Sequence, residues 1–203
     1  MRAALRHPAA WWVILFLGLL PLASLLHQTL QDQLGPNPAE ALIRATGDWT
    51  LRSLCVVLAV TPLRGLLGWP ELLRFRRMLG LWVFCYASLH LLCYAWFDMG
   101  FDWTDTLQDI IKRPFILVGF GAFLILLALA ATSFNRAIRW LGGQRWRWLH
   151  RGVYAVAALA ILHFWWMRAG KQDFAEVLVY AGILASLLAW RVLQWWRRRD
   201  RTL

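Results

Sequence analysis

The sequence predicts an all-α integral membrane protein, a bundle of six transmembrane helices with both termini in the cytoplasm. Hydrophobic residues make up 60% of the 203-residue chain and charged residues only 16%, too few to cover a water-soluble domain of this size. Six apolar segments each supply roughly the 20 residues that a helix needs to cross about 30 Å of hydrocarbon. Strand-like alternation is absent, which excludes a membrane barrel. The loops are short, so residues 1–203 are expected to form a single domain.

The first three expected spans are each bounded by a recognisable signal. The first, about residues 11–30, follows Arg2 and Arg6; its apolar run is long for a signal peptide, and removing it would break the alternation of charge across the membrane. The second, about 49–68, lies between the turn sequences LGPNP and TPLRGLLGWPE. The third, about 78–97, follows a basic segment and ends at FDMGFDW. Connections this short make neighbouring spans antiparallel.

The last three expected spans follow the same pattern. The fourth, about 114–133, opens within the segment KRPFILVGFGAF, and the fifth, about 148–167, follows the turn LGGQR. The sixth, about 174–196, follows RAGKQD and ends in the basic tail RRRDR, which is typical of a stop-transfer anchor on anionic lipid. Tryptophans gather near the ends of the spans, as expected for side chains at the membrane interface.

The placement of charge predicts the orientation of the bundle. A net charge of +11 alone would also fit a nucleic-acid-binding protein. Most basic residues, however, fall on segments that share a side with the N-terminus, in clusters around Arg2, Arg74–Arg77, Arg136–Arg151 and Arg191–Arg201, whereas most acidic residues fall on the opposite side. This is the positive-inside pattern of a multi-pass membrane protein. We therefore expect contact with membrane lipid and none with nucleic acid.

The segment TPLRGLLGWPELLRFRR, between the second and third spans, differs from the other connections. Its two prolines, four arginines and apolar remainder could lie in the membrane interface as a short amphipathic piece. Anchoring to lipid headgroups is the simplest role for these arginines. The alternative is a site for an anionic cofactor phosphate, or for a docking partner, at Arg74, Arg76 and Arg77.

Four of the five histidines lie in the expected spans, where ionisable residues are costly and usually face an interior site. His27 is near the outer end of the first span, where water is close, so it needs no special role, and the other three are His90, His150 and His163. His90 is about 18 Å from the cytoplasmic end of the third span, and His163 is about 22 Å from that of the fifth. The two therefore match in depth within one helical turn. His150 lies at the cytoplasmic edge, about 20 Å along the axis from His163 and about 140° around it, so these two cannot share a metal.

A matched pair of imidazoles among Leu, Phe and Trp, with no carboxylate or thiolate beside it, suits a haem iron ligated on both faces. Zinc would require three or four ligands, and copper a thiolate or a third histidine. With both axial positions filled, the haem would transfer electrons rather than bind oxygen or substrate. Spacing thus makes His90 and His163 the candidate iron ligands, while hydrogen bonding between helices stays open as their alternative role.

Three stretches of the chain carry a resemblance to a known family. They are TPLRGLLGWPELLRFRRMLGLWVFCYASLHLLCYAWFD, which contains His90; KRPFILVGFGAF; and WRWLHRGVYAVAALAILHFWW, which contains His150 and His163. Over nearly its whole length the chain resembles the ferric-reductase-like transmembrane family, and within it the haem-binding membrane subunits of bacterial periplasmic methionine sulfoxide reductase systems. The three stretches together form a specific signature, which no single histidine would be.

The resemblance implies a b-type haem and FMN as cofactors, with Arg76 and Arg77 as candidates for contact with the FMN phosphate. It implies a multi-pass protein of the bacterial inner membrane that receives electrons from the quinol pool or from a cytoplasmic flavin reductase. It also implies a partner, a soluble periplasmic methionine sulfoxide reductase with a molybdopterin cofactor, which repairs oxidised methionines. The chain would then be an electron-transfer subunit with no catalytic residue of its own.

Departures from the family pattern leave the number of haems open. Two-haem relatives carry a second histidine on the third span, about four turns inward of the first, where this chain has Arg76 and Arg77. His150 therefore lacks a histidine partner, and it could ligate a second haem singly, contact a propionate, or line the path from an inner cofactor. The sequence carries no GxGxxG motif after the last span, so we expect the reductant to come from another molecule.

Other functions stay open from the residues alone. A b561-like quinol or ferric reductase would use the same paired histidines. A proton-coupled transporter would use membrane histidines as a relay, but it predicts acidic partners within the spans, which contain almost none. A non-catalytic membrane scaffold would leave the histidines as packing residues. A haem spectrum is the observation that separates these functions.

Overall fold

The computed structural model describes residues 2–170 and 172–200, and every regular element in these ranges is a helix. Arg201, at the end of the last basic cluster, lies outside the described residues. The elements in chain order are α1 (Arg2–Arg6), α2 (Ala9–Leu30), α3 (Pro38–Leu67), the 3-10 helix η1 (Pro70–Phe75), α4 (Arg76–Phe97), α5 (Trp103–Lys112), α6 (Pro114–Ala131), α7 (Asn135–Leu141), α8 (Gly143–Leu149), α9 (Gly152–Ala169) and α10 (Ala175–Arg199).

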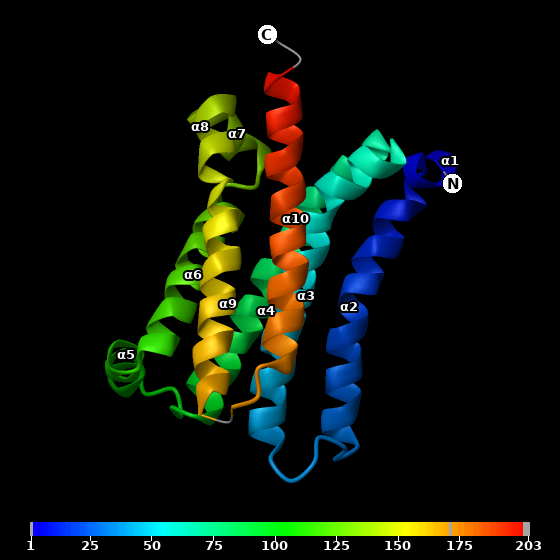
Figure 1. Ribbon diagram of the computed structural model, residues 1–203. Helices are drawn as coiled ribbons and strands as arrows, with labels where there is room; N and C mark the ends of the chain where they lie inside the picture. Colours follow the sequence, from blue (N-terminus) through cyan, green and yellow to red (C-terminus); the bar gives the residue numbers. More distant parts are fainter. Residues whose placement is uncertain (1, 171, 201–203) are drawn as a thin grey trace.

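Six helical stretches within the described ranges are long and apolar enough to cross a membrane, which confirms the predicted all-α bundle. Figure 1 shows both chain termini at one end of this bundle, near α1, α7 and α8, and α5 at the other. We call these the terminal end and the α5 end. Which end faces the cytoplasm stays a prediction from the placement of charge. The six stretches are Ala9–Leu30, Pro38–Leu67, Pro70–Phe97, Pro114–Ala131, Gly143–Ala169 and Ala175–Arg197.

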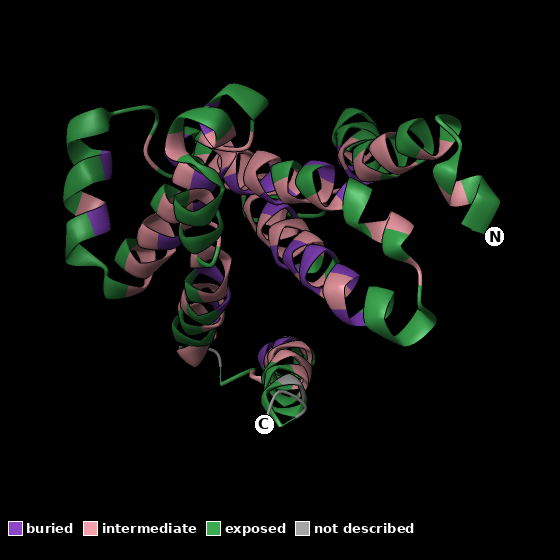
Figure 2. Cartoon of the chain, turned by 90° about the horizontal axis from the view of Figure 1, so that it is seen from above, coloured by how far each residue is buried: buried purple, intermediate pink, exposed green. Residues whose placement is uncertain are grey.

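The core lies where the spans meet in the middle of the bundle. α3 packs along α4, and α6 packs along α9. Leu54 and Leu58 of α3, Val83 of α4, Val156 of α9 and Val177 of α10 are almost completely buried in one apolar cluster. Figure 2 shows exposed residues along the outward faces of the helices, and these include many apolar side chains that would contact lipid. A helix satisfies its own backbone groups, so it can present such a face to hydrocarbon.

The second span begins at Pro38 rather than near residue 49, because a local cap starts the helix early. The Asn37 side chain accepts a hydrogen bond from the Glu40 backbone N–H (3.2 Å), and Pro38 occupies the first helical position. Glu40 forms an ion pair with Arg44 one turn later. The charged residues of this segment are therefore helical rather than part of a loop.

The helix α5 was not expected from the sequence. The Asp102 side chain caps it by accepting a hydrogen bond from the Asp105 backbone N–H (2.9 Å). Thr106 and Ile110 are buried on one side of α5, which packs against α6. The helix is short and carries both polar and apolar faces, so it does not register as a span. The apolar residues left exposed on it are Trp103, Leu107 and Ile111.

The fifth span is interrupted near its expected start. α8 ends at Leu149 and α9 begins at Gly152, so His150 lies at the junction instead of inside a continuous helix from residue 148. The Trp146 indole donates a hydrogen bond to the Thr132 carbonyl (2.9 Å), which fastens α8 to the end of α6. This junction places His150 at the terminal end of the bundle.

Candidate functional site

The structure brings two of the three candidate histidines together. His90 comes from α4 and His163 from α9, and their ring centroids are 6.3 Å apart with an angle of 77° between the ring planes. Both residues lie in the half of their helix that approaches the α5 end. Counting residues along the spans predicted this match in depth. The pair is the centre of the candidate site.

Each imidazole is oriented by a hydrogen bond to a backbone carbonyl of a neighbouring helix. His90 Nδ1 lies 2.8 Å from the Ile43 oxygen on α3, and His163 Nδ1 lies 2.6 Å from the Phe115 oxygen on α6. A carbonyl oxygen can only accept, so the proton of each ring is on Nδ1. The lone pair is then on Nε2, as in histidines that ligate a metal through Nε2 while Nδ1–H bonds a backbone carbonyl.

Each imidazole also lies against a glycine one turn beyond the carbonyl that it contacts. A Cβ atom at Gly47 would lie 3.1 Å from His90 Cε1, and one at Gly119 would lie 2.8 Å from His163 Nδ1. At 2.8 Å, only glycine fits next to His163. At 3.1 Å, a side chain at position 47 would fit only if the His90 ring moved slightly. The same carbonyl-and-glycine arrangement therefore holds both rings.

The spacing of the rings fits two ligands on opposite faces of one iron. A bond between a metal and an imidazole nitrogen is about 2.0–2.1 Å, so two such ligands place their ring centroids roughly 6–6.5 Å apart. The observed 6.3 Å lies in this range. Within the described residues no three His, Cys, Asp or Glu side chains gather to hold a bare metal ion, which disfavours zinc. The donor set and its apolar surroundings fit a haem.

His150 lies apart from the pair, in a cavity of about 1020 Å³ near the terminal end. Its ring stacks on Trp146 with centroids 4.0 Å apart, and its Nε2 is 3.2 Å from the Thr132 hydroxyl. His90 and His163 are not among the residues that line this cavity. The structure therefore separates two regions: the histidine pair, and a larger space beside His150.

The large cavity is strongly basic. Arg76 and Arg77, at the start of α4, line it together with His150, and none of the described residues that line it is acidic. Arg77 donates a hydrogen bond to the Asn135 side chain (2.9 Å). Arg74 also borders the cavity, but its guanidinium bonds the backbone oxygens of Leu5 and Arg6 and so fastens η1 to the N-terminal segment. A space with these walls suits a large ligand that carries negative charge.

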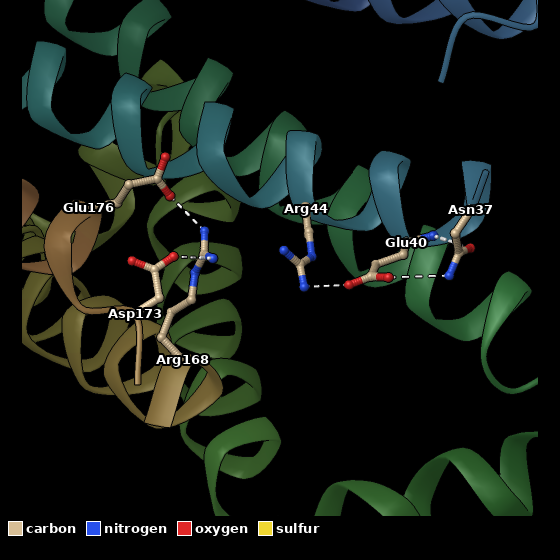
Figure 3. A network of polar contacts seen from close by, with 6 residues as sticks. All are labelled: Asn37, Glu40, Arg44, Arg168, Asp173 and Glu176. Atoms are coloured by element: carbon tan, nitrogen blue, oxygen red, sulfur yellow. Dashed lines mark hydrogen bonds and ion pairs between the residues drawn. The ribbon is translucent and has the colours of Figure 1, made fainter. Parts of the chain in front are cut away.

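At the α5 end, charged side chains link α9 to α10 and form an ion pair within α3 (Figure 3). Arg168 of α9 bridges Asp173 (3.1 Å) and Glu176 of α10 (2.6 Å). Arg44 pairs with Glu40 on α3, directly beside the Ile43 carbonyl that His90 contacts. The Arg168 pairs join the end of α9, the helix that carries His163, to the start of α10.

The sequence alone did not indicate a role for Ile43, Gly47, Phe115 or Gly119. Both glycines lie inside helices, and a glycine there is a signal for close approach of a neighbour. The sequence does not say which neighbour approaches, because the lateral pairing of α3 with α4 and of α6 with α9 decides that. The histidines could be identified from the sequence without knowing their neighbours, because an ionisable residue in an apolar span is rare.

Comparison with known proteins gives two kinds of match. Residues 46–161 match the family described as "Ferric reductase like transmembrane component". A protein of Polaromonas naphthalenivorans (strain CJ2) named "Protein-methionine-sulfoxide reductase heme-binding subunit MsrQ" is 60% identical over 97% of this chain and 90% of its own length. Proteins of the same name from Herminiimonas arsenicoxydans and Bordetella pertussis are 54% and 55% identical, over 91% and 90% of this chain and 84% and 88% of their own lengths. No solved structure matches the chain.

Proposed function

Because the chain belongs to the MsrQ family of haem-binding subunits of protein-methionine-sulfoxide reductase, among the ferric-reductase-like transmembrane components, we propose that it carries electrons across the bacterial inner membrane. The acceptor is a periplasmic methionine sulfoxide reductase with a molybdopterin cofactor. The donor is the quinol pool or a cytoplasmic flavin reductase. The protein thereby supports the repair of oxidised methionines in periplasmic proteins.

The histidine pair is the observation that carries this proposal. His90 and His163 would hold a haem b, and this group would supply one-electron transfer through its iron. The hydrogen bonds to Ile43 and Phe115 orient the rings and make the ligating nitrogens more basic. The glycines at positions 47 and 119 let the rings sit close to α3 and α6. A haem held by both histidines would transfer electrons rather than bind a substrate.

The basic cavity at the terminal end takes the second cofactor. Arg76 and Arg77 bind the phosphate of FMN, because guanidinium groups recognise phosphate through charge-assisted hydrogen bonds. His150 lines the same cavity and contacts this cofactor or a second haem. The basic side chains that line the cavity support an anionic ligand of either kind.

A spectrum of the purified protein tests the haem assignment. The membrane protein, produced with sufficient haem, should show the sharp absorption bands of a b-type cytochrome on reduction with dithionite. His90→Ala or His163→Ala should abolish these bands, because each removes one of two axial ligands. His150→Ala should leave at least part of the signal. His27→Ala, on the exposed face of α2, is the control and should leave the spectrum intact.

The same samples separate this function from its alternatives. A colourless wild-type protein would support a transporter or a scaffold instead. Bands that persist in both His90→Ala and His163→Ala would show that the iron is held elsewhere. Deleting the gene should stop quinol-dependent methionine sulfoxide reduction in the periplasm, while the soluble reductase should remain active with an artificial dye.

A further inference from the structure

A second, smaller cavity lies between α3 and α10 at the terminal end. Its volume is about 510 Å³, and its walls include Thr61 and Gly65 of α3, Tyr154 of α9, and Trp190, Arg191 and Gln194 of α10. None of the described residues that line it is acidic, and two arginines do so. The cavity is therefore distinct from the histidine pair, and it favours a ligand that accepts hydrogen bonds.

Two buried polar atoms in the walls of this cavity have no hydrogen-bond partner, the Thr61 hydroxyl oxygen and Arg191 Nε. A threonine in a helix normally bonds back to a carbonyl one turn earlier, as Thr46 and Thr50 do on the same helix. Thr61 does not. A buried polar group without a partner costs free energy, so each such group indicates a missing ligand or another compensating feature.

The Arg191 guanidinium is held in place by its other nitrogens. Its two Nη atoms donate to the Tyr154 hydroxyl (2.7 Å) and to the Leu58 carbonyl (2.6 Å). Tyr154 also lines the large cavity that contains His150 and Arg76. One tyrosine therefore separates the two cavities, and a ligand in the small cavity would lie next to a cofactor in the large one.

Aromatic side chains form the flat part of the small cavity. Trp190 packs directly on the backbone of α3 at Gly65, where an added Cβ would lie 2.7 Å from its ring. Trp195 also lines the cavity and is 54% exposed, so the cavity opens to the outside of the bundle at the terminal end. A planar, apolar ring with carbonyl oxygens complements these walls better than a compact phosphate does, because the ring stacks while its oxygens accept hydrogen bonds.

We propose that this cavity is the binding site for the quinone class of membrane electron carriers, with Thr61 and Arg191 donating hydrogen bonds to a ring oxygen and Trp190 stacking on the ring. The inference rests on the proposed function, which requires an electron donor, and assigns that donor a site. On oxidation, one quinol releases two electrons and two protons and leaves as the quinone. A haem held by His90 and His163 would take these electrons one at a time and pass each to the periplasmic reductase of the proposed function before taking the next, and the two protons would go to water at the terminal end.

Photochemical labelling tests the site directly. Full-length protein in nanodiscs of phosphatidylcholine is illuminated with a short-chain azido-quinone, and the modified peptides are mapped by mass spectrometry. Labels should fall on α10 between Trp190 and Trp195 and on α3 near Gly65. Thr61→Val should weaken labelling affinity about three- to tenfold, the effect of one hydrogen bond. The variant keeps the shape of the side chain and removes an unsatisfied group, so folding is preserved.

Thr50→Val is the matched control, because its hydroxyl bonds within the helix and lies outside the cavity. Equal labelling of Thr61→Val and Thr50→Val, or labels elsewhere in the chain, would overturn the site. Loss of labelling when phosphatidylglycerol is added to the nanodiscs, at the same azido-quinone concentration, would also overturn the site. That result would identify a site for a lipid headgroup instead.

Haem reduction distinguishes a failure of this inference from a failure of the proposed function. Dithionite should reduce the haem in wild type, Thr61→Val and Thr50→Val alike, whereas a short-chain quinol at limiting concentration should reduce it more slowly in Thr61→Val only. If dithionite reduces the haem but quinol does not, and the azido-quinone does not label the protein, the haem assignment stands and the quinone site is wrong. A protein without haem would fail both proposals.

Discussion

Gly119 and Gly47 have no side chain, and this leaves room for the two imidazole rings. Each imidazole of the pair approaches a helix backbone closely enough to bond its carbonyl, and a side chain at the adjacent glycine would occupy the same space. The glycine positions thus set how far His90 and His163 can withdraw from each other, and so they set the spacing that a shared iron needs. The effect should be stronger at Gly119, where the added atom would be 2.8 Å from the ring, than at Gly47, where it would be 3.1 Å away.

We expect Gly119→Ala to displace the His163 ring and weaken its hydrogen bond to Phe115. Overpacking of this kind costs about 1–3 kcal/mol of stability. The haem content per protein, measured by absorbance, should fall, and the thermal unfolding midpoint should drop. Gly121→Ala on the same helix is the control, since nothing lies within 4 Å of a Cβ there, and it should behave as wild type. Unchanged haem content and spectrum in Gly119→Ala would show that α6 does not position this ligand.

At the scale of helices, hydropathy predicted the spans and local capping shifted their limits. The six apolar runs were visible in the sequence because about 20 consecutive apolar residues are rare outside membranes. The early start of α3 at Pro38 and the whole of α5 were missed, although Asn37 and Asp102 both stand three residues before an acidic residue, a pattern typical of helix starts. The segments around these two residues are rich in polar side chains, and for that reason they were expected to be loops rather than the starts of helices.

Only part of the candidate site could be predicted from the sequence. The depth of His90 and His163 followed from counting residues along rigid helices, and this part needed no knowledge of neighbours. The rest of the site depends on which helices lie side by side and on how each helix is rotated about its axis. This holds for the carbonyls and glycines that contact the two rings, and for the Thr61 hydroxyl, which has no hydrogen-bond partner. Apolar spans carry little rotational information, because almost every face is hydrophobic. The lateral arrangement was therefore beyond sequence inspection.

Besides the packing of Thr106 and Ile110, one carboxylate links the helix α5 to the bundle. Asp109 accepts hydrogen bonds from the Tyr94 hydroxyl of α4 (2.6 Å) and from Arg113 (2.7 Å). Asp109→Ala leaves the buried Tyr94 hydroxyl without this partner, so α5 should open more often. Losing about 1–2 kcal/mol of local stability corresponds to roughly five- to thirtyfold faster amide exchange. Hydrogen exchange of α5 measured by mass spectrometry should show this rise.

Asp105→Ala serves as the charge-matched control for α5, because Asp105 is exposed on the same helix. Its exchange should increase less than that of Asp109→Ala. Equal rates in the two variants would mean that the packing of Thr106 and Ile110, rather than the Asp109 contacts, holds α5 in place.

At the scale of the whole molecule, the two candidate regions lie toward opposite ends of the bundle. α9 links them, since His150 precedes its first turn and His163 lies in its second half. The basic cavities are at the terminal end, and the histidine pair lies toward the α5 end. Transfer from a cytoplasmic or quinol donor to a periplasmic acceptor therefore requires the terminal end to face the cytoplasm. The positive charges clustered there favour this orientation.

Labelling of single cysteines in spheroplasts tests this orientation. In a chain whose native Cys55, Cys85 and Cys93 are replaced by alanine, Gln108→Cys places a thiol on the exposed surface of α5, and Gln144→Cys places one on exposed α8. A membrane-impermeant maleimide should modify Gln108→Cys in intact spheroplasts and Gln144→Cys only after lysis. The reverse pattern would put the histidine pair on the donor side, where it could not pass electrons outward. Because six spans return the chain to its starting side, tags at the two termini must respond alike to added protease, and a difference between them would contradict the even number of crossings.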